Sequence, residues 1–181
     1  MPRFVAFLRA VNLGGNTTLR MEALRETLGT ARFGPVETIL QSGNVLLSSD
    51  ALDAPALETR LERLLDRSFG LRTDVLARTA DEWHEVVRRN PFPEAARDDP
   101  SHLTVLILKS PARTGAWEDL ARGIQGREVV KAAGRWGYLV YPDGIGQSRL
   151  TLERIERALG TRGTLRNWNT TLKIEERLAA T

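Results

Sequence analysis

The sequence predicts an α+β protein made of two halves that share one order of elements, β-α-β-β-α-β, together with a linking helix and a C-terminal helix. Three observations support this prediction. Short apolar runs rich in β-branched and aromatic residues alternate with segments whose apolar residues recur at helical spacing. Clusters of Gly, Pro and Asn separate these segments. The same order of strands and helices occurs before and after a proline-rich stretch at residues 90–102.

The first half opens with a strand and a helix. "RFVAFLRAV", at residues 3–11, is apolar and partly β-branched, which is typical of a strand. After the loop "NLGGNTT", residues 19–29 place Met21, Leu24 and Leu28 on one face of a predicted helix.

A hairpin and a second helix follow. Residues 36–40 and 44–49 are short predicted strands, and the "QSGN" turn that joins them is typical of a tight hairpin. Asp53 is a suitable N-cap for a helix over residues 54–70, because its side chain accepts hydrogen bonds from free backbone N–H groups.

The fourth strand, at residues 71–78, leads into the linking helix. Thr79 and Glu82 form a T-x-x-E capping box that opens a helix over residues 80–89. Prolines end this helix, and residues 90–102 are expected to form a linker.

The second half repeats the order of elements without a detectable repeat of residues. Strands are expected at 103–109, 127–134, 136–142 and 163–168, and helices at 115–124, 148–160 and 169–180. This order is the ferredoxin-like arrangement. The predicted organisation is therefore a first ferredoxin-like half at 1–79, a helix and Pro-rich linker at 80–101, and a second half with its closing helix at 102–181.

Composition excludes several kinds of chemistry. The 181 residues include no cysteine, so disulfides and thiolate nucleophiles are excluded. Lys and Arg number 26 against 23 Asp and Glu, and no basic block predicts a nucleic-acid tail. The N-terminus is too charged for a signal peptide, and no apolar run approaches the roughly 20 residues of a membrane helix. A cytoplasmic protein without a membrane partner is expected.

Polar residues of the first half are expected to gather at one edge of its sheet. In the ferredoxin-like arrangement, the loop after strand one and the hairpin between strands two and three lie at the same edge. The candidate ligand-binding residues there are Arg9, Asn12, Gly14, Gly15, Asn16, Gln41, Ser42, Gly43 and Asn44. A tight hairpin needs Ser-Gly-Asn for its own structure, so Arg9 and Gln41 are the residues least easily explained without a ligand.

The second half is expected to place its own candidates at one edge, where "DGIGQS" faces the end of the last strand. These candidates are Gly144, Gly146, Ser148, Arg166, Asn167, Trp168 and Asn169. Ser148 is expected at a helix N-terminus with unpaired N–H groups, and Arg166 offers a forked donor for a carboxylate or phosphate.

The stretch "RNWN" also has a purely structural interpretation. Trp168 then anchors the core, and the flanking asparagines satisfy backbone groups at a strand-to-helix corner. Arg166 pairs with a carboxylate in this interpretation, whereas in the functional one it lines a ligand pocket with the asparagines. The sequence leaves both open.

A series of motifs runs in order along the chain. The motifs are Arg-x-x-Asn-x-Gly-Gly at Arg9–Gly15, Gln-Ser-Gly-Asn-Val at Gln41–Val45, Asn-Pro-Phe at Asn90–Phe92, Gly-Ile-Gly-x-Ser at Gly144–Ser148 and Arg-Asn-Trp-Asn-Thr at Arg166–Thr170. Together they resemble a bacterial family known as domain of unknown function 1697. The resemblance implies two ferredoxin-like halves and supplies no activity.

The departures from the family pattern are small. Ala10 stands where glycine is common, Ile39 where an aromatic residue is frequent, and Gln147 where a basic residue is common. The last of these weakens the expectation of an anion site.

Motifs for cofactor or metal chemistry are weak. The Gly-Gly loop matches neither G-x-x-x-x-G-K-[ST] nor G-x-G-x-x-G, so neither a P-loop nor a dinucleotide-binding fold is predicted. His84 and His102 lack a second histidine at ligand spacing, so neither a metal site nor a cofactor is expected. Asp98 and Asp99 are interpreted as a solvated turn, and no histidine is tied to Ser42.

The sequence therefore predicts a cofactor-free module that binds a small polar or anionic ligand in one site. The residues expected to hold the ligand are Arg9, Asn12, Gln41, Asn44, Arg166 and Asn169. One alternative is a metal-independent enzyme that uses the same loops, although it has no obvious general base. Another is a nucleic-acid-binding protein in which Trp136 and Tyr138 stack bases. The oligomeric state is left open.

Overall fold

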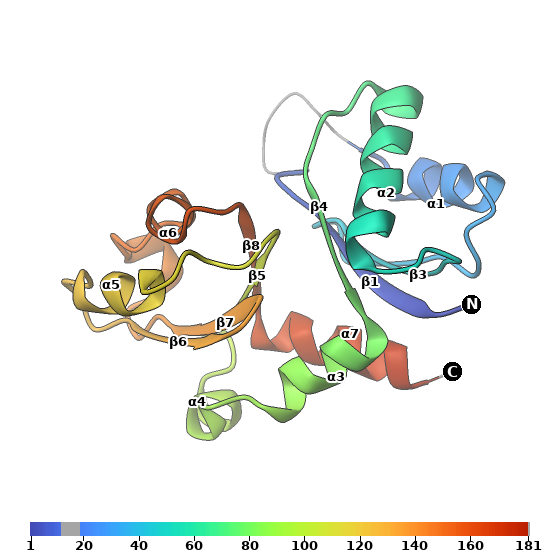
Figure 1. Ribbon diagram of the computed structural model, residues 1–181. Coiled ribbons are helices and arrows are strands. Elements are labelled where there is room, and N and C mark those ends of the chain that lie inside the picture. Colours follow the sequence, from blue (N-terminus) through green and yellow to red (C-terminus); the bar gives the residue numbers. More distant parts are fainter. Residues whose placement is uncertain (12–18, 181) are drawn as a thin grey trace. The chain divides into compact units, whose positions relative to one another are not determined.

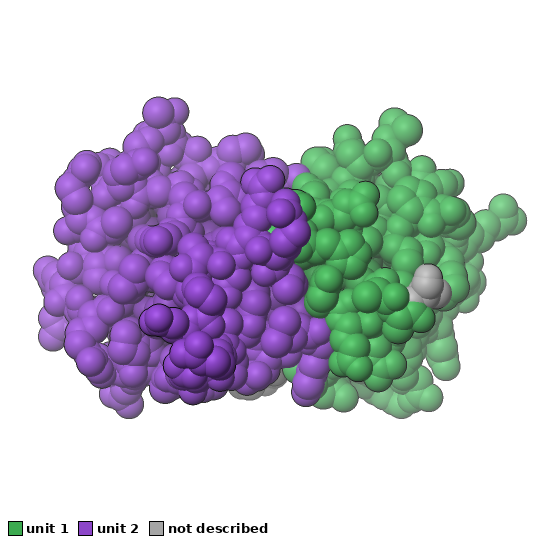
Figure 2. All heavy atoms as spheres, turned by 90° about the horizontal axis from the view of Figure 1, so that it is seen from below, with its two compact units in different colours: residues 1–85, 174–181 green, residues 86–173 purple. Residues whose placement is uncertain are grey.

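The computed structural model describes residues 1–11 and 19–180. The chain divides into two compact units, of which unit 1 comprises residues 1–85 and 174–181 and unit 2 comprises residues 86–173 (Figure 2). Over the described residues the protein is an α+β protein with two four-stranded antiparallel sheets and seven α-helices (Figure 1). None of the helices among these residues is long and apolar enough to cross a membrane.

Unit 1 contains a sheet with the strand order β2-β3-β1-β4. Its elements are β1 (Arg3–Leu8), α1 (Met21–Thr30), β2 (Glu37–Ile39), β3 (Asn44–Ser48), α2 (Ala54–Phe69) and β4 (Val75–Thr79), with parts of α3 (Ala80–Arg88) and α7 (Trp168–Ala179). Strand β1 is central, pairing antiparallel with β3 on one side and β4 on the other.

The core of unit 1 lies between one face of this sheet and helices α1 and α2. Alternate residues of β1 contribute Phe4, Ala6 and Leu8, as the two-residue period of a strand requires. The helices contribute apolar residues at helical spacing to the same core. These are Met21, Leu24 and Leu28 from α1, and Leu57, Leu61 and Leu65 from α2.

Unit 2 has a sheet with the strand order β6-β7-β5-β8. Its elements are α4 (Pro93–Asp98), β5 (Leu103–Leu108), α5 (Ala116–Arg122), β6 (Val129–Ala133), β7 (Trp136–Val140), the 3-10 turn η1 (Ile145–Gln147), α6 (Leu152–Leu159) and β8 (Gly163–Asn167). Strand β5 is central, and its core face packs with α5 and α6 through residues that include Leu106, Leu108, Leu120, Ile155 and Leu159.

Three details differ from the sequence prediction. The linker at 90–102 contains a short helix, α4. Helix α6 begins at Leu152 rather than at Ser148, because the Thr151 side chain accepts the hydrogen bond of the Arg154 N–H and caps the helix there. Helix α7 likewise begins at Trp168.

In both units a glutamate from a helix binds the backbone of the last strand, at the edge of the sheet. In unit 1, Glu62 of α2 accepts the N–H of Val75 at the start of β4, at 2.9 Å. In unit 2, Glu156 of α6 accepts the N–H of Gly163 at the start of β8, at 2.8 Å. Each glutamate satisfies an outward-facing donor of an edge strand, which protects that edge from pairing with another chain.

The strand-to-helix corners also match. Arg78 of β4 stands opposite Val5, and Arg166 of β8 stands opposite Val105. In each unit the next residue along the chain, Thr79 or Asn167, uses its side-chain oxygen to cap the helix that follows.

Candidate functional site

The end of β1 and the hairpin between β2 and β3 lie at one edge of the unit 1 sheet, as predicted. The N–H of Leu8, at the end of β1, donates to the carbonyl of Gly43 in the hairpin at 2.8 Å. Arg9 follows directly, and its N–H donates to the carbonyl of Asp74 at 3.0 Å. The predicted residues Asn12, Gly14, Gly15 and Asn16 lie outside the described residues.

The hairpin between β2 and β3 uses its most distinctive residues for its own structure. Asn44 is fully buried, and its side-chain amide donates to the Ile39 carbonyl at 2.8 Å and to the Ser42 hydroxyl at 3.0 Å. Gly43 has a φ of +75°, and a Cβ there would lie 2.6 Å from Val11 Cγ2. A tight, internally bonded turn accounts for both residues.

The remaining unit 1 candidates are more open. Gln41 is exposed, and Ser42 and Arg9 are half-buried. Two residues of these loops that are not glycine, Ala10 and Leu40, have left-handed φ values of 53° and 60°. Such conformations are uncommon for side chains other than Gly, Asn and Asp.

The bend after β7 in unit 2 differs from the prediction in the position of Ser148. Ser148 lies after the 3-10 turn rather than at a helix N-terminus; its hydroxyl accepts the Leu150 N–H at 2.9 Å and donates to Glu128. Gly144 has a φ of +82°, and a Cβ there would meet only His102 Nε2, at 3.6 Å. A Cβ at Gly146 would meet nothing within 4 Å, so this part of the bend is open.

The corner between β8 and α7 is built around Trp168, which is 4% exposed. The Asn167 carboxamide oxygen accepts the Thr170 N–H at 2.9 Å, so Asn167 is the cap of α7 and the expected cap, Asn169, lies exposed within the first turn. The Asn167 carbonyl also accepts the Thr171 hydroxyl at 3.1 Å. These contacts favour the structural interpretation for Asn167 and Trp168.

Arg166 directs its guanidinium along its own strand. One NH group donates to the Thr164 hydroxyl at 2.7 Å and to the Leu165 carbonyl at 2.8 Å. Burial lowers the pKa of Arg166 to about 10, so the side chain is still a cation at neutral pH.

The Asn-Pro-Phe motif also has a local structural use. The side chain of Asn90 accepts the Phe92 N–H at 3.0 Å and donates to the Phe92 carbonyl at 3.3 Å. This turn joins the end of α3 to α4, and the Lys131 ammonium lies 5.5 Å from the centre of the Phe92 ring.

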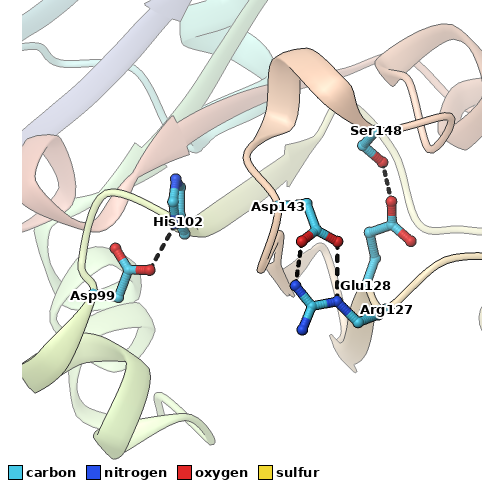
Figure 3. A network of polar contacts seen from close by, with 6 residues as sticks. All are labelled: Asp99, His102, Arg127, Glu128, Asp143 and Ser148. Carbon is cyan, nitrogen blue, oxygen red and sulfur yellow. Dashed lines mark hydrogen bonds and ion pairs between the residues drawn. The ribbon is translucent and has the colours of Figure 1, made fainter.

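A larger polar cluster occupies the edge of unit 2 where β5 and β6 begin and β7 ends. We call it the polar edge, and its residues are Asp99, His102, Arg127, Glu128, Asp143 and Ser148 (Figure 3). The strand register explains why they meet: Val140 at the end of β7 stands opposite both Leu103 of β5 and Val129 of β6. Segments that are distant in the sequence are thereby brought to one edge.

Two pairs of side chains organise the polar edge. The Asp99 carboxylate lies 2.6 Å from Nδ1 of His102, whose side chain is 38% exposed. Arg127 approaches Asp143 with two nitrogens, one of them Nε at 3.0 Å. Hydrogen bonding to Arg127 holds the pKa of Asp143 below its usual value, and His102 contributes to this lowering by charge.

Tyr141 is buried next to His102, to whose carbonyl its N–H donates at 2.8 Å, and its phenol keeps its proton near neutral pH. Burial raises the pKa of this phenol well above its usual value, and the neighbouring Glu128 raises it further. Its hydroxyl donates to the Leu150 carbonyl at 3.1 Å, which gives the buried ring a structural role.

Sequence reasoning missed the pairing of Asp99 with His102. The available signal was Asp-x-x-His immediately before an apolar strand, a spacing that brings the two side chains together only if the intervening "PS" turns. In the structure the His102 N–H donates to the Asp99 carbonyl at 3.1 Å, which closes that turn. Asp98, interpreted with Asp99 as solvated, pairs with the adjacent Arg97 on the surface.

No group of three or more His, Asp or Glu side chains among the described residues is arranged to hold a metal ion. Two open surface hollows of about 380 and 410 Å³ occur in units 2 and 1. Their linings include Glu153, Glu156 and Arg162 in the first and Glu26, Thr30 and Ser68 in the second, and none of the predicted site residues lines either hollow.

The structure thus defines an α+β protein of two four-stranded sheets, each with polar groups gathered at one edge. The chain belongs to the family described as "Protein of unknown function (DUF1697)", whose model matches residues 1–138, and the resemblance inferred from the motifs is confirmed. The motifs at Gly144–Ser148 and Arg166–Thr170 lie beyond the matched residues.

A solved structure supports the fold. The conserved bacterial protein SP0830 from Streptococcus pneumoniae is 19% identical to the chain, with a TM-score of 0.76 and coverage of 98% of each chain. At this identity the likeness shows the fold alone. No curated protein matches the chain.

Proposed function

We propose that this protein binds a small polar ligand at the polar edge of unit 2. One observation carries the proposal. Asp99 orients the His102 ring through Nδ1, while Nε2 faces the glycine bend at Gly144 and has no hydrogen-bond partner among the described residues. An oriented, partly exposed imidazole beside a glycine bend with free space around it is a polar group that can hydrogen-bond to a ligand.

The charge of the polar edge favours a neutral or cationic ligand over an anion. Asp99, Glu128 and Asp143 supply three carboxylates against the single guanidinium of Arg127. The Arg127 fork is already engaged by Asp143, so an anion would have to displace that carboxylate. A ligand that donates hydrogen bonds from hydroxyl or amine groups suits this edge better.

The single site expected from the sequence stays a prediction. Arg9, Gln41 and Asn44 belong to unit 1, and Arg166 and Asn169 belong to unit 2. Asn44 is committed to the hairpin, which leaves Gln41 and Arg9 as the unit 1 side chains most suited to a ligand. The binding of an anionic ligand by Arg9 also remains a prediction. The same holds for the cytoplasmic location.

The same edge supports a metal-independent enzyme as the second candidate function. The sequence offered no general base for this alternative, and the Asp99–His102 pair is a group of the right kind. Nucleic-acid binding has less support. Tyr138 is 1% exposed and its hydroxyl donates to the Val86 carbonyl at 2.7 Å, so its ring offers little surface for stacking.

We also propose that the halves at 1–79 and 102–181 are duplicated ferredoxin-like modules. Identical strand orders support this, as do the paired edge glutamates and the matched strand-to-helix corners. Backbone bonds also correspond. Arg9 donates to Asp74 and Lys109 donates to Arg162, in each case joining the end of the first strand to the start of the last.

Thermal unfolding against a ligand panel tests the binding proposal. The panel contains polyols, sugars and amines in one arm, and phosphate, sulfate and nucleotides in the other. A ligand at 100 times its Kd stabilises by about 2.7 kcal/mol, which raises the midpoint by roughly 5–10 °C at this chain length. The shift should appear in the first arm and vanish in His102→Ala.

Arg157→Ala is the matched control for Arg127→Ala, because each arginine is exposed and paired with a carboxylate of unit 2. A hit from the anion arm that is lost in Arg127→Ala would overturn the charge argument. Hits that survive His102→Ala would place the ligand elsewhere.

A further inference from the structure

The Asp99–His102 pair fixes which ring nitrogen of His102 is available. Near neutral pH a carboxylate accepts hydrogen bonds, so at 2.6 Å from Asp99 the Nδ1 atom carries a proton and donates it. In the neutral ring Nε2 then holds the lone pair. A carboxylate that selects one tautomer of a histidine is the arrangement by which imidazole bases are oriented.

The surroundings of Nε2 leave room for a ligand. A Cβ built on Gly144 would lie 3.6 Å from His102 Nε2. Because glycine has no Cβ, the space of a methyl group stays open in front of this nitrogen. Gly146 adds further open space along the bend. A side chain larger than hydrogen at Gly144 would narrow the approach to the ring.

The charged groups around His102 support a proton-accepting role. Asp99 contacts the ring directly, and Asp143 interacts with it by charge. Arg127 is the opposing cation, but it is bound to Asp143 and shares its charge with that carboxylate. Asp99 and Asp143 thus place two carboxylates near the ring that would receive the proton.

We infer that His102 is a general base that removes a proton from a hydroxyl group of the ligand bound at the polar edge, with Asp99 as its positioning residue. In this step the O–H bond breaks, its electron pair stays on the ligand oxygen, and the proton passes to Nε2. The imidazolium later returns the proton to the product or to water. This inference rests on the proposed function, because the bound ligand is the substrate.

The other histidine provides a control of matched geometry. His84 of α3 has Nδ1 at 2.6 Å from Glu175 of α7, and its side chain is 41% exposed. The two pairs therefore share a carboxylate distance and an exposure, but only His102 lies beside a glycine bend. The second oxygen of Glu175 is buried without a hydrogen-bond partner among the described residues, which suits a structural contact.

The tautomer is the first test. Because the chain has only two histidines, a long-range ¹H–¹⁵N spectrum of the labelled protein resolves each ring. In the neutral ring of wild-type His102, Nδ1 should be the protonated nitrogen, and Asp99→Asn should shift the population toward the other tautomer. A His102 ring protonated on Nε2 in the wild type overturns the inference.

The second test measures the reactivity of the lone pair with p-nitrophenyl acetate. Nε2 attacks the acetyl carbonyl, the C–N bond forms, and the C–O bond breaks with release of p-nitrophenolate. Water then attacks the acetylimidazole, releasing acetate and restoring the ring. The unprotonated ring is the reactive form, and the rate should fall at least tenfold in His102→Asn.

Three further variants separate a base from an ordinary surface histidine. Asp99→Asn should lower the rate several-fold and change the pH profile, Asp99→Glu should restore part of it, and His84→Asn should leave it unchanged. An equal loss in His84→Asn and His102→Asn would overturn the inference. A panel ligand that binds through His102 while the ester probe is inert would refute the general base but preserve the binding proposal. An ester probe that reacts through His102 while no panel ligand binds there would refute the binding proposal but preserve the general base.

Discussion

The hairpin of unit 1 at residues 40–44 and the bend of unit 2 at residues 143–148 carry similar residues but use them differently. In the hairpin, Asn44 is buried and bonded within the turn, and a Cβ on Gly43 would collide with neighbouring side chains. In the bend, Gly144 faces an imidazole and Gly146 faces open space. Glycine and polar residues in a loop therefore indicate a binding site only where the space beside the glycine is open and the polar groups are not used within the loop.

Gly43→Ala should give the largest effect in this comparison. A left-handed alanine costs about 1–2 kcal/mol, and overpacking against Val11 and Leu8 adds about 1–3 kcal/mol. Urea unfolding should therefore show a loss of roughly 2–5 kcal/mol. Gly146→Ala is the matched control, with an expected change within about 0.5 kcal/mol. Equal values for the two variants would remove the distinction between the loops.

Asn44→Ala should be the next most harmful change. It removes two hydrogen bonds and leaves the Ile39 carbonyl in a buried turn without its partner, which costs about 1–3 kcal/mol. Asn169→Ala, an exposed asparagine without such a bond, should stay within about 0.5 kcal/mol. If the two substitutions cost the same, Asn44 is not the internal brace of the hairpin.

Gly144→Ala tests whether the bend of unit 2 is open. Gly144 combines a φ of +82° with a ψ of 146°, a backbone conformation that costs other residues about 1–3 kcal/mol. No collision is added, because the nearest atom is His102 Nε2 at 3.6 Å. The loss should be smaller than for Gly43→Ala, and the imidazole signals of His102 should shift while those of His84 stay in place. An unperturbed His102 spectrum would contradict the placement of the ring against the bend.

Asn167→Ala should cost about 1 kcal/mol, the usual value for a lost helix cap. Asn167→Asp should keep most of the stability, because its side chain also accepts the Thr170 N–H. In unit 1, Thr79→Ala removes the matching cap and should cost a similar amount. A large difference between the two caps would show that the corners are alike in geometry but not in energy.

The smallest effect concerns the ion pair of the polar edge. Arg127→Ala should raise the pKa of Asp143 toward the ordinary aspartate value of about 3.9. Carboxyl NMR measures this change. Since the folded-state pKa is lowered, the pair stabilises the protein above the unfolded pKa and loses this contribution as the pH falls through the folded pKa. An unchanged Asp143 titration would show that the pair is not formed in solution.

Local patterns were sufficient to predict the order of the strands and of the other α-helices, but not the short helix α4. Leucine stripes such as Leu57, Leu61 and Leu65 and the alternation in β1 depend only on neighbours within one element. The edges at which the loops meet followed from the handedness of the connections. The start of α7 did not, because Asn167 and Asn169 are equally good caps and the register of β8 decides between them.

The chemistry of the polar edge was harder to foresee. The sequence places Asp99 in a solvated turn and leaves His102 without a second histidine at ligand spacing, whereas their pairing depends on a turn that a sequence pattern does not specify. The filling of the space beside Gly43 by Val11 is likewise a tertiary property. The sequence located the candidate loops, and only the packing around them separated the filled loop from the open one.

The division of unit 1 between two stretches of the chain has a consequence for its biosynthesis. Arg3 donates to the Leu178 carbonyl at 2.9 Å, and Arg177 pairs with Glu37 at 3.4 Å. β1 is therefore synthesised before residues 174–180, and these contacts close only when both are present, whereas unit 2 is one continuous stretch whose synthesis is complete earlier. The unit whose synthesis begins first is the one whose assembly ends last.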